Sequence, residues 1–383
     1  MAGHTDRAEE ARILELLRRA DAATLDRAVR HLDLGKLLGD VDDHPGGPQH
    51  RTDLLLLLGR ARLRDLSVAG REAVITALQR GRTGSRREQV IRDILLGTRG
   101  ADLTALKNAI DAGGDAHDLD RLVFHDLDDA ALREQVLAHF AREAAAAPSG
   151  ELKVLSDIDD TLYRNWVDER YPPKAIYPGV RALYHELDVG PDGTGRPGDL
   201  VFVTARPGDR PGLVEEHTIG TLGRLGLARF VVLTGSLTKV TSNEAIARGK
   251  LEAIGRYRRL FPEYDLVFLG DSGQGDAIVA AALMADHADA TRAVFIHDVI
   301  HTPPEGRAEW AARGVPLFDT YVGAAAHALE RGLISPAGLR RVVAAAREEL
   351  EAIAFPDEAV RAARRDELRR DAARAEALAP EGE

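Results

Sequence analysis

The sequence predicts two parts, an all-helical domain followed by an α/β domain built on a doubly wound parallel sheet. After residue 150, short apolar runs alternate with helical patterns, which is typical of parallel strands buried on both faces of a sheet. Before that point only helical patterns occur. The aromatic residues change in frequency at the same place, because Phe124 and Phe140 alone precede residue 148 and every Trp and Tyr follows it.

Residues 1–148 are predicted to form the all-helical domain, as a bundle or a repeat-like array of unknown role. Ser85 and Asp102 are the residue types that cap helix N-termini, so we expect helices to begin directly after them. The Pro-Ser-Gly sequence at 148–150 ends the last helix and marks the domain boundary. The clearest predicted helices cover 86–96, 103–112 and 128–147.

Residues 149–330 are predicted to form the α/β domain. The apolar runs that we interpret as strands are Leu152–Leu155, Leu200–Val203, Phe230–Leu233, Leu266–Leu269 and Ala293–Ile296. The helical patterns between them cover 179–187, 212–226, 244–260 and 275–285. Residues 331–383 are predicted to be a helical extension, in which arginines such as Arg364 and Arg365 alternate with glutamates and indicate a solvated face.

Composition excludes several classes of protein. Hydrophobic residues make up 44% of the 383 residues and charged residues 30%, as in ordinary globular proteins. The chain has no cysteine, which excludes disulfides, zinc–thiolate sites and a cysteine nucleophile, and fits a cytoplasmic location. A net charge of −11 argues against nucleic-acid binding and leaves room only for a local, peripheral contact with a membrane.

Polar residues follow three of the predicted strands at the point where each strand ends. The first is followed by Asp157, Asp159 and Thr161, the second by Thr204 and Arg206, and the fourth by Asp271 and Asp276. In a doubly wound sheet, ligands bind beyond the carboxyl ends of the strands. We therefore expect these side chains to meet in one crevice.

The first group has the spacing that phosphoryl transfer needs. Asp157 and Asp159 are two residues apart, so their side chains point the same way as the chain leaves the strand. One carboxylate can attack phosphorus, and the other can protonate the leaving alkoxide and then activate water. Mg²⁺ would offset the repulsion between two carboxylates and a phosphate, with Asp271 as a further oxygen ligand. Thr204 can donate to a phosphoryl oxygen, and a lysine is needed to neutralise the transferring group.

The order of these residues resembles the haloacid dehalogenase superfamily of phosphatases. The chain carries Asp157-Ile158-Asp159-Asp160-Thr161, then Thr204, a lysine, and Gly270-Asp271 with Asp276. Lys250 is the preferred motif lysine because it lies on the helix that leads to the strand carrying Asp271, and Lys239 is the alternative. The resemblance implies that Asp157 is the nucleophile and Asp159 the acid/base. It also implies that Asp157, the Asp159 carbonyl and Asp271 bind the metal, with Asp276 as a further ligand or as a support for the ligands. Thr161 and Arg206 are the candidate substrate contacts.

Within that superfamily, residues 151–300 most resemble the catalytic domain of the actin-patch-type phosphatidate phosphatases. The matching segments are Ser156–Thr161, Tyr177–Val180 with Leu183-Tyr184, Leu260–Pro262 and Leu266–Gly273. The resemblance implies Mg²⁺-dependent removal of phosphate from phosphatidic acid, with diacylglycerol as the product.

The chain leaves no room for a large cap domain at either usual insertion point, which favours a bulky substrate such as a lipid phosphate. Two alternatives stay open. In the first, the substrate is a phosphorylated macromolecule or a small metabolite, and the helical domain serves as a lid over the site. Alternatively, the helical domain is a protein-interaction scaffold, with an unidentified protein partner, to which the phosphatase is an accessory.

Charged groups outside this crevice have simpler explanations. The acidic clusters at Asp40–His44 and His125–Asp129 are predicted to be solvated turns and helix caps, since they lack the ligand positions of a calcium loop. His297 and His301 flank the end of the fifth strand and are predicted to be structural rather than catalytic.

Overall fold

The protein is described by a computed structural model in two compact units. The first contains Met1–Pro148 with Tyr257–Glu263, and the second contains Ser149–Arg256 with Tyr264–Glu383. None of the helices in the described part of the chain has the length and apolar character that crossing a bilayer requires. The residues that the structure describes are 6–80, 83–112, 118–148, 150–193, 195, 198, 200–207, 230–235 and 242–380.

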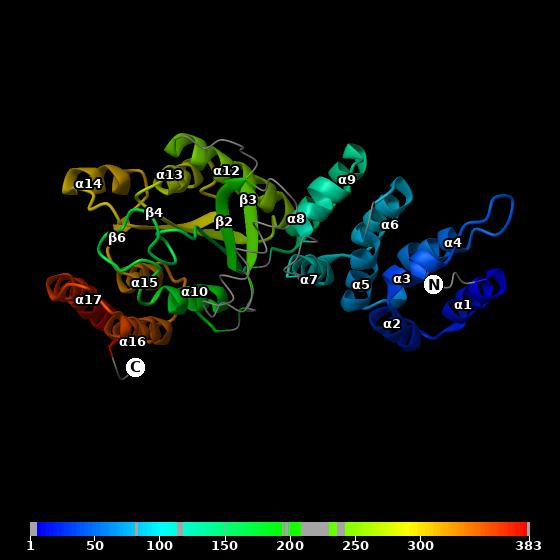
Figure 1. Ribbon diagram of the computed structural model, residues 1–383, viewed down its shortest axis with the longest axis horizontal. Coiled ribbons are helices and arrows are strands. Elements are labelled where there is room, and N and C mark those ends of the chain that lie inside the picture. Colours follow the sequence, from blue (N-terminus) through cyan, green and yellow to red (C-terminus); the bar gives the residue numbers. More distant parts are fainter. Residues whose placement is uncertain are drawn as a thin grey trace. The chain divides into compact units, whose positions relative to one another are not determined.

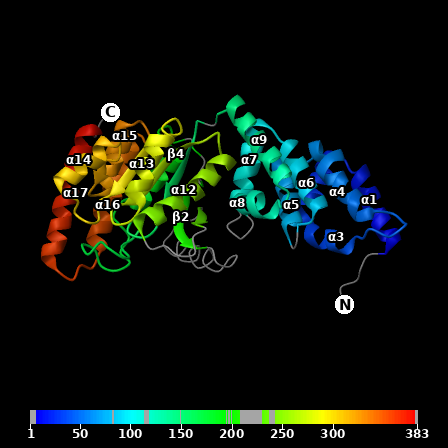
Figure 2. The same ribbon diagram turned by 90° about the horizontal axis from the view of Figure 1, so that it is seen from above.

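The first unit is an array of helices, each packed mainly on helices that follow it closely in the chain (Figures 1 and 2). This order favours the repeat-like array over a closed bundle. Its elements are α1 (Arg7–Arg19), α2 (Ala22–His31), α3 (Leu34–Asp40), α4 (His50–Leu56), a π-helical turn (Leu57–Ala61), a 3₁₀ turn (Leu63–Asp65), α5 (Val68–Gln79), α6 (Ser85–Leu96), α7 (Gly100–Asp111), α8 (Leu119–Arg121), a second π-helical turn (Leu122–Asp126) and α9 (Ala130–Ala146).

The two predicted N-caps are wrong by a few residues. Ser85 is the first residue of α6, after Gly84, and Asp102 lies in the first turn of α7, after Arg99. In α7 the capping acceptor comes from elsewhere in the chain, because the Gly100 amide donates to Glu143 Oε2 at 2.9 Å. Asp102 still places a negative charge at the positive end of the helix dipole.

The second unit contains a six-stranded sheet in the order β3-β2-β1-β4-β5-β6, and all neighbouring strands are parallel. This confirms the predicted fold class and all five predicted strands. The sixth was not predicted, because it has only two residues. The strands are β1 (Leu152–Ser156), β2 (Leu200–Pro207), β3 (Val231–Gly235), β4 (Asp265–Asp271), β5 (Thr291–His297) and β6 (Leu317–Phe318).

Helices cover both faces of the sheet, as Figure 1 shows. α12 (Asn243–Leu260) and α13 (Asp276–Asp286) lie on one face, and α10 (Val180–Val189) and α15 (Tyr321–Glu330) lie on the other. Alternate strand residues point to opposite faces, and both faces are covered, so most strand residues are apolar and buried. The predicted helix at 212–226 lies outside the described residues. The unit also contains α14 (Pro304–Ala312), α16 (Pro336–Ala352) and α17 (Glu358–Leu378).

The C-terminal helices α16 and α17 are part of the hydrophobic core of this unit. α16 approaches the start of α10 so closely that a Cβ on Gly179 would lie 3.0 Å from the Ala346 side chain. Gly179 also has a φ of +86°, which favours glycine. The expectation of a fully solvated arginine face is wrong for Arg364, which is 6% exposed, because α17 packs against the rest of the unit along that face.

A buried ion pair holds the segment 257–263 within the helical unit. Lys107 of α7 is 1% exposed, and its Nζ donates to Glu263 Oε2 at 2.7 Å and to the Leu260 carbonyl at 2.8 Å. The same Nζ lies 4.7 Å from the ring centre of Phe140 and 5.1 Å from that of Phe261. The lysine is therefore compensated by a charge, a carbonyl and two aromatic faces.

We expect Lys107→Ala to lower the free energy of unfolding of the helical unit by about 3–5 kcal/mol, because it leaves Glu263 buried without its cation. Lys36→Ala is the control, since Lys36 is exposed and pairs with Asp40 one helical turn away. That control is expected to cost less than about 0.5 kcal/mol. Urea denaturation of both variants measures the difference, and equal effects would contradict a structural role for Lys107.

Candidate active site

The carboxyl ends of β1, β2 and β4 bring the predicted residues to one edge of the sheet. β1 lies between the other two, with Ser156 aligned to Phe202 of β2 and to Leu269 of β4. Asp157 follows directly, and its amide donates to the Leu269 carbonyl at 2.9 Å. Asp271 ends β4, so the parallel register places the two aspartates side by side.

Lys250 forms the central contact of the site. Its Nζ donates to Asp157 Oδ1 at 2.6 Å and to Asp276 Oδ1 at 2.5 Å. Lys250 is 2% exposed and lies in the first half of α12, whereas Asp276 begins α13 and is fully buried. The lysine thus joins a residue after β1 to a residue after β4. The alternative lysine, Lys239, lies outside the described residues.

Asp271 completes a cluster of three buried carboxylates. Oxygens of Asp157, Asp271 and Asp276 all lie within 4.8 Å of one another. Asp271 Oδ1 accepts from the Gly273 amide at 2.7 Å. Among the described residues, Asp157 Oδ2 and Asp271 Oδ2 are buried and have no hydrogen-bond partner. Two carboxylate oxygens are therefore buried at the same place without a donor.

Burial and mutual repulsion raise the proton affinity of these groups. Burial raises the pKa of Asp157 to about 7, the ion pair with Lys250 opposes the shift, and the nearby Asp276 adds to it. Burial, followed by the charges of Asp276 and Asp157, raises the pKa of Asp271 well above its usual value. Although burial alone would lower the pKa of Lys250, its two carboxylate partners raise it. Among the side chains that the structure describes, one cation thus faces three carboxylates.

The donor set fits a hard divalent cation. All three side chains supply carboxylate oxygen, which is the ligand type that Mg²⁺ takes in proteins. The free Oδ2 atoms of Asp157 and Asp271 would supply two ligands. Asp276 is less available, because Oδ1 is bound to Lys250 and Oδ2 accepts from the Asp271 amide at 3.3 Å. The structure therefore fits Asp276 as the residue that holds the lysine better than as a ligand.

Asp159 lies beside this cluster and is half-buried. Its Oδ1 accepts a hydrogen bond from Asn165 Nδ2 at 2.8 Å. Asn165 in turn accepts from Lys174 Nζ. Asn165 was not identified from the sequence, because nothing in its local pattern separates it from an ordinary loop asparagine.

The remaining predicted residues are placed as follows. Thr204 is 6% exposed near the end of β2, aligned with Thr234 of β3. Thr161 is fully buried, and its Oγ1 has no hydrogen-bond partner among the described residues. Arg206 lies on β2, but its side chain is outside the described part of the structure. The substrate-binding roles of Thr161 and Arg206 stay predictions.

Glycines allow the acidic loop to reach its position. A Cβ on Gly270 would lie 2.5 Å from the Cβ of Asp276, and one on Gly275 would lie 2.5 Å from the Asn243 carbonyl oxygen. Real Cβ atoms essentially never come this close to other heavy atoms. The loop between Asp271 and Asp276 therefore packs directly against the start of the helix that carries Lys250.

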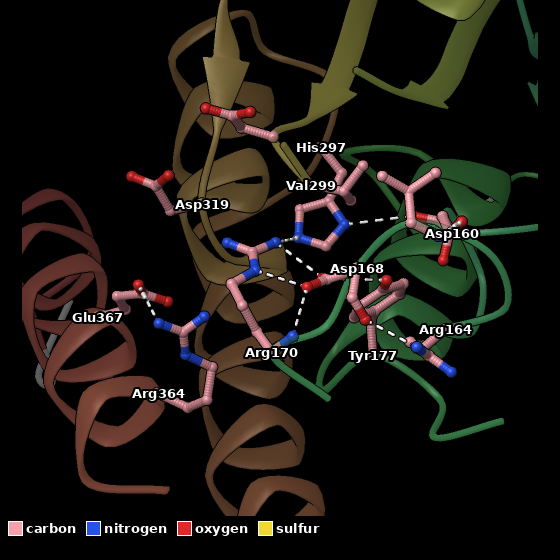
Figure 3. A network of polar contacts seen from close by, with 12 residues as sticks. Asp160, Arg164, Asp168, Arg170, Tyr177, His297, Val299, Asp319, Arg364 and Glu367 are labelled. Carbon is pink, nitrogen blue, oxygen red and sulfur yellow. Dashed lines mark hydrogen bonds and ion pairs between the residues drawn. The ribbon is translucent and has the colours of Figure 1, made fainter. Parts of the chain in front are cut away.

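A second network, which sequence reasoning missed, supports the loop that follows Asp159 (Figure 3). Arg170 Nε and Nη2 donate to the two oxygens of Asp168 at 2.8 Å each, and Tyr177 donates to Asp168 Oδ2 at 3.1 Å. His297 lies against Arg170 and is 1% exposed. Burial, followed by the charge of Arg170, lowers the pKa of His297 to about 4. This histidine is a neutral packing residue, consistent with the structural role predicted for it.

The helical unit contains a separate histidine–carboxylate group. Glu10 Oε2 lies 2.8 Å from His50 Nδ1 and 3.0 Å from His44 Nε2, and Glu10 Oε1 accepts from the Asp42 amide at 2.9 Å. His44 therefore does not lie in a merely solvated turn, as the sequence suggested. It belongs to a local network around the buried Glu10.

Comparison with known proteins supports the resemblance noted in the sequence. Residues 152–298 match the family model described as the catalytic domain of phosphatidate phosphatase APP1. The matched segment contains β1 to β5, Asp157, Lys250 and Asp271. No curated protein and no solved structure matches the chain.

Asp271→Asn is expected to stabilise the metal-free protein by about 1–3 kcal/mol at pH 7.5, and by less at pH 5. The raised pKa of Asp271 means that the folded state retains a proton that the unfolded state releases. The buried Asp271 carboxyl group therefore lowers the free energy of unfolding once the pH exceeds its ordinary pKa, and it lowers it further as the pH rises. Asn keeps the shape and the acceptor for Gly273.

Urea denaturation in the presence of a chelator at both pH values measures this effect. Asp286→Asn is the control, because Asp286 is exposed at the last residue of α13. A destabilised Asp271→Asn protein at pH 7.5 would show that the three carboxylates do not oppose folding.

Proposed function

We propose that this protein is an Mg²⁺-dependent phosphatase that removes phosphate from phosphatidic acid or a similar lipid phosphate through an aspartyl-phosphate intermediate. The observation that carries the proposal is the buried Asp157–Lys250–Asp276 arrangement beside Asp271, within the segment that matches the phosphatidate phosphatase family model. A buried carboxylate whose second oxygen lacks a donor is suited to bind or attack an electropositive centre.

The proposed reaction has two steps that use the same two aspartates. A carboxylate oxygen of Asp157 bonds to phosphorus as the bond from phosphorus to the ester oxygen breaks, and Asp159 gives the leaving alkoxide its proton. Asp159 then takes a proton from a water molecule. That water attacks phosphorus, the bond from phosphorus to Asp157 breaks, and inorganic phosphate leaves.

The other residues position the reacting groups and balance their charge. Lys250 holds Asp157 in place and supplies positive charge where the phosphoryl group would bind. Asn165 orients Asp159 through its hydrogen bond. Mg²⁺, held by Asp157 and Asp271, would offset the repulsion between the carboxylates and the phosphate. Thr204 would donate to a phosphoryl oxygen.

A lipid substrate is supported by the family match and by the loop after β1. The residues between β1 and α10 contain no helix or regular strand, so no cap domain is inserted there. A site without this cap gives a small phosphate ester few remote contacts, so little binding energy is available to lower its barrier.

We expect phosphatidic acid in mixed micelles to exceed glycerol 3-phosphate in kcat/KM by at least ~100-fold, which corresponds to about 2.7 kcal/mol. Phosphate release across phosphatidic acid, glycerol 3-phosphate, nucleotides and phosphopeptides measures this preference. Equal values for phosphatidic acid and glycerol 3-phosphate would reject the lipid substrate but leave the chemistry standing. Preference for a phosphopeptide would favour a macromolecular substrate.

Asp157→Asn tests the nucleophile within the same assay. We expect a loss of at least ~1,000-fold in kcat, because an amide keeps the shape but cannot form the acyl phosphate. Asp286→Asn is the matched control and should retain full activity. Activity of Asp157→Asn above a tenth of wild type would exclude Asp157 as the nucleophile.

Chelation should abolish activity, and Mg²⁺ should raise the melting temperature of the protein, because only the folded state assembles the three carboxylates. Asp271→Ala should abolish this shift in melting temperature, while Asp286→Asn should keep it. A shift of the same size in Asp271→Ala would place the metal elsewhere.

A further inference from the structure

Two large apolar side chains are exposed at the edge of the candidate active site. Trp166 is 68% exposed and Ile300 is 50% exposed, the highest values for large hydrophobic residues in the described part of the second unit. Trp166 lies in the loop after Asp159, and Ile300 lies in the turn after β5. Figure 3 shows both segments side by side, represented by Asp160 and Asp168 on one and by Val299 on the other.

The first loop is held rigidly by a buried carboxylate. Asp160 is fully buried and adopts a φ of +58°. Its Oδ1 accepts from the Asn165 amide at 2.8 Å, and its Oδ2 accepts from the amides of Trp166 at 2.9 Å and Val167 at 2.8 Å. Three hydrogen bonds thus fix the backbone that presents the Trp166 side chain to solvent.

The second turn is held in the same way. Asp298 is fully buried, and its carboxylate accepts from the Thr302 amide at 3.0 and 3.1 Å and from Arg307 Nη2 at 2.6 Å. The turn that carries Ile300 lies between these anchored residues. Ser272 Oγ, from the acidic loop after β4, also donates to Asp298 at 3.0 Å. Ile300 is therefore exposed on a braced turn and not on a freely moving one.

The two segments meet at Gly273, two residues after the candidate metal ligand Asp271. A Cβ placed on Gly273 would lie 3.2 Å from Val167 Cγ2, 3.2 Å from Val299 Cγ2 and 3.1 Å from Asp271 Oδ1. The residues adjacent to Trp166 and Ile300 thus pack next to the Asp271 carboxylate. We call Trp166, Val167, Val299 and Ile300 the apolar rim.

Three of the four rim residues also line a neighbouring groove of about 660 Å³. Val167, Val299 and Ile300 contribute apolar lining, as do Ala359, Val360 and Ala363 of α17. The rest of the lining is charged or polar and consists of Glu169, Arg170, His301 and Arg364. A cation also lies close to the rim. Lys174 is exposed, donates to Asn165 and has its Nζ 4.8 Å from the ring centre of Tyr163.

We propose that the apolar rim docks the catalytic unit on a phospholipid surface, inserting Trp166 and Ile300 among the headgroups so that the site meets the phosphate there. This inference rests on the proposed function, because it concerns how that site reaches a lipid substrate. Trp favours the membrane–water interface, and an adjacent cation favours an anionic lipid surface. Rigid backbone reduces the entropy lost on binding.

The test uses a double variant that carries both Trp166→Ala and Ile300→Ser. Leu378→Ser is the control. Leu378 is 39% exposed on α17, away from the rim residues in the sequence and absent from the groove lining. Co-sedimentation with vesicles of phosphatidylcholine and phosphatidic acid, in the presence of a chelator, measures binding without turnover. We expect the double variant to bind at least 10-fold more weakly than wild type, with binding by the control unchanged.

A second readout follows Trp166 itself. The chain has two tryptophans, so Trp310→Phe leaves Trp166 as the only one. We expect the fluorescence of this variant to shift to shorter wavelength when vesicles are added, because the indole leaves water. If this variant binds the vesicles and its fluorescence spectrum does not shift, the apolar rim is not the surface that contacts the membrane.

Activity separates docking from the proposed function. The double variant should lose at least 10-fold in kcat/KM on vesicular phosphatidic acid and less than 2-fold on water-soluble dibutyryl phosphatidic acid. Equal losses on both substrates, or unchanged vesicle binding, would overturn the docking proposal. If the wild-type protein binds vesicles through the rim but hydrolyses neither substrate, the proposed function is overturned and the docking proposal is not. Concentration-dependent self-association that the double variant abolishes, without vesicle binding, would assign the rim to a second copy of the chain.

Discussion

Three carboxylates are buried together in this protein, and Lys250 is the cation that makes their burial possible. It donates to both Asp157 and Asp276, which follow different strands. A buried pair of this kind is weak evidence for added stability, because desolvation offsets the attraction. Its value lies in geometry, because the lysine fixes the spacing of Asp157 and Asp276. Among the described side chains, three carboxylates face this one lysine, and the remaining negative charge suits the site to a divalent cation.

Close backbone packing also fixes the positions of the carboxylates. Gly270 and Gly275 leave no space for a side chain against Asp276 and the start of α12. The acidic loop and the start of α12 thereby pack closely against each other, in addition to the contact between Lys250 and Asp276. The loop after β1 is held differently, by amides that donate to Asp160. The site thus combines three ordered segments, each fixed by a different local interaction.

The sequence was sufficient to predict the five longer strands and the meeting of Asp157 and Asp271, because strand ends in a parallel sheet meet at one edge whatever the helices do. Lys250 lies on a helix, so it was preferred over Lys239 only through the family resemblance and its place in the chain. The sequence was not sufficient for features that depend on distant contacts. The burial of Arg364 requires the packing of α17, and the anchoring role of Asp160 requires its left-handed conformation. Neither leaves a local signal in composition or periodicity.

The last helices of the chain have a consequence for the order in which the protein folds during synthesis. Tyr321 of α15 donates to the Thr161 carbonyl, and Glu349 of α16 accepts from the Gly179 amide at 2.7 Å. The segment that follows the candidate nucleophile is therefore completed by residues that leave the ribosome more than 150 positions later. Because a domain folds as a unit, the segment around the catalytic centre reaches its final packing only after α15 and α16 have been synthesised.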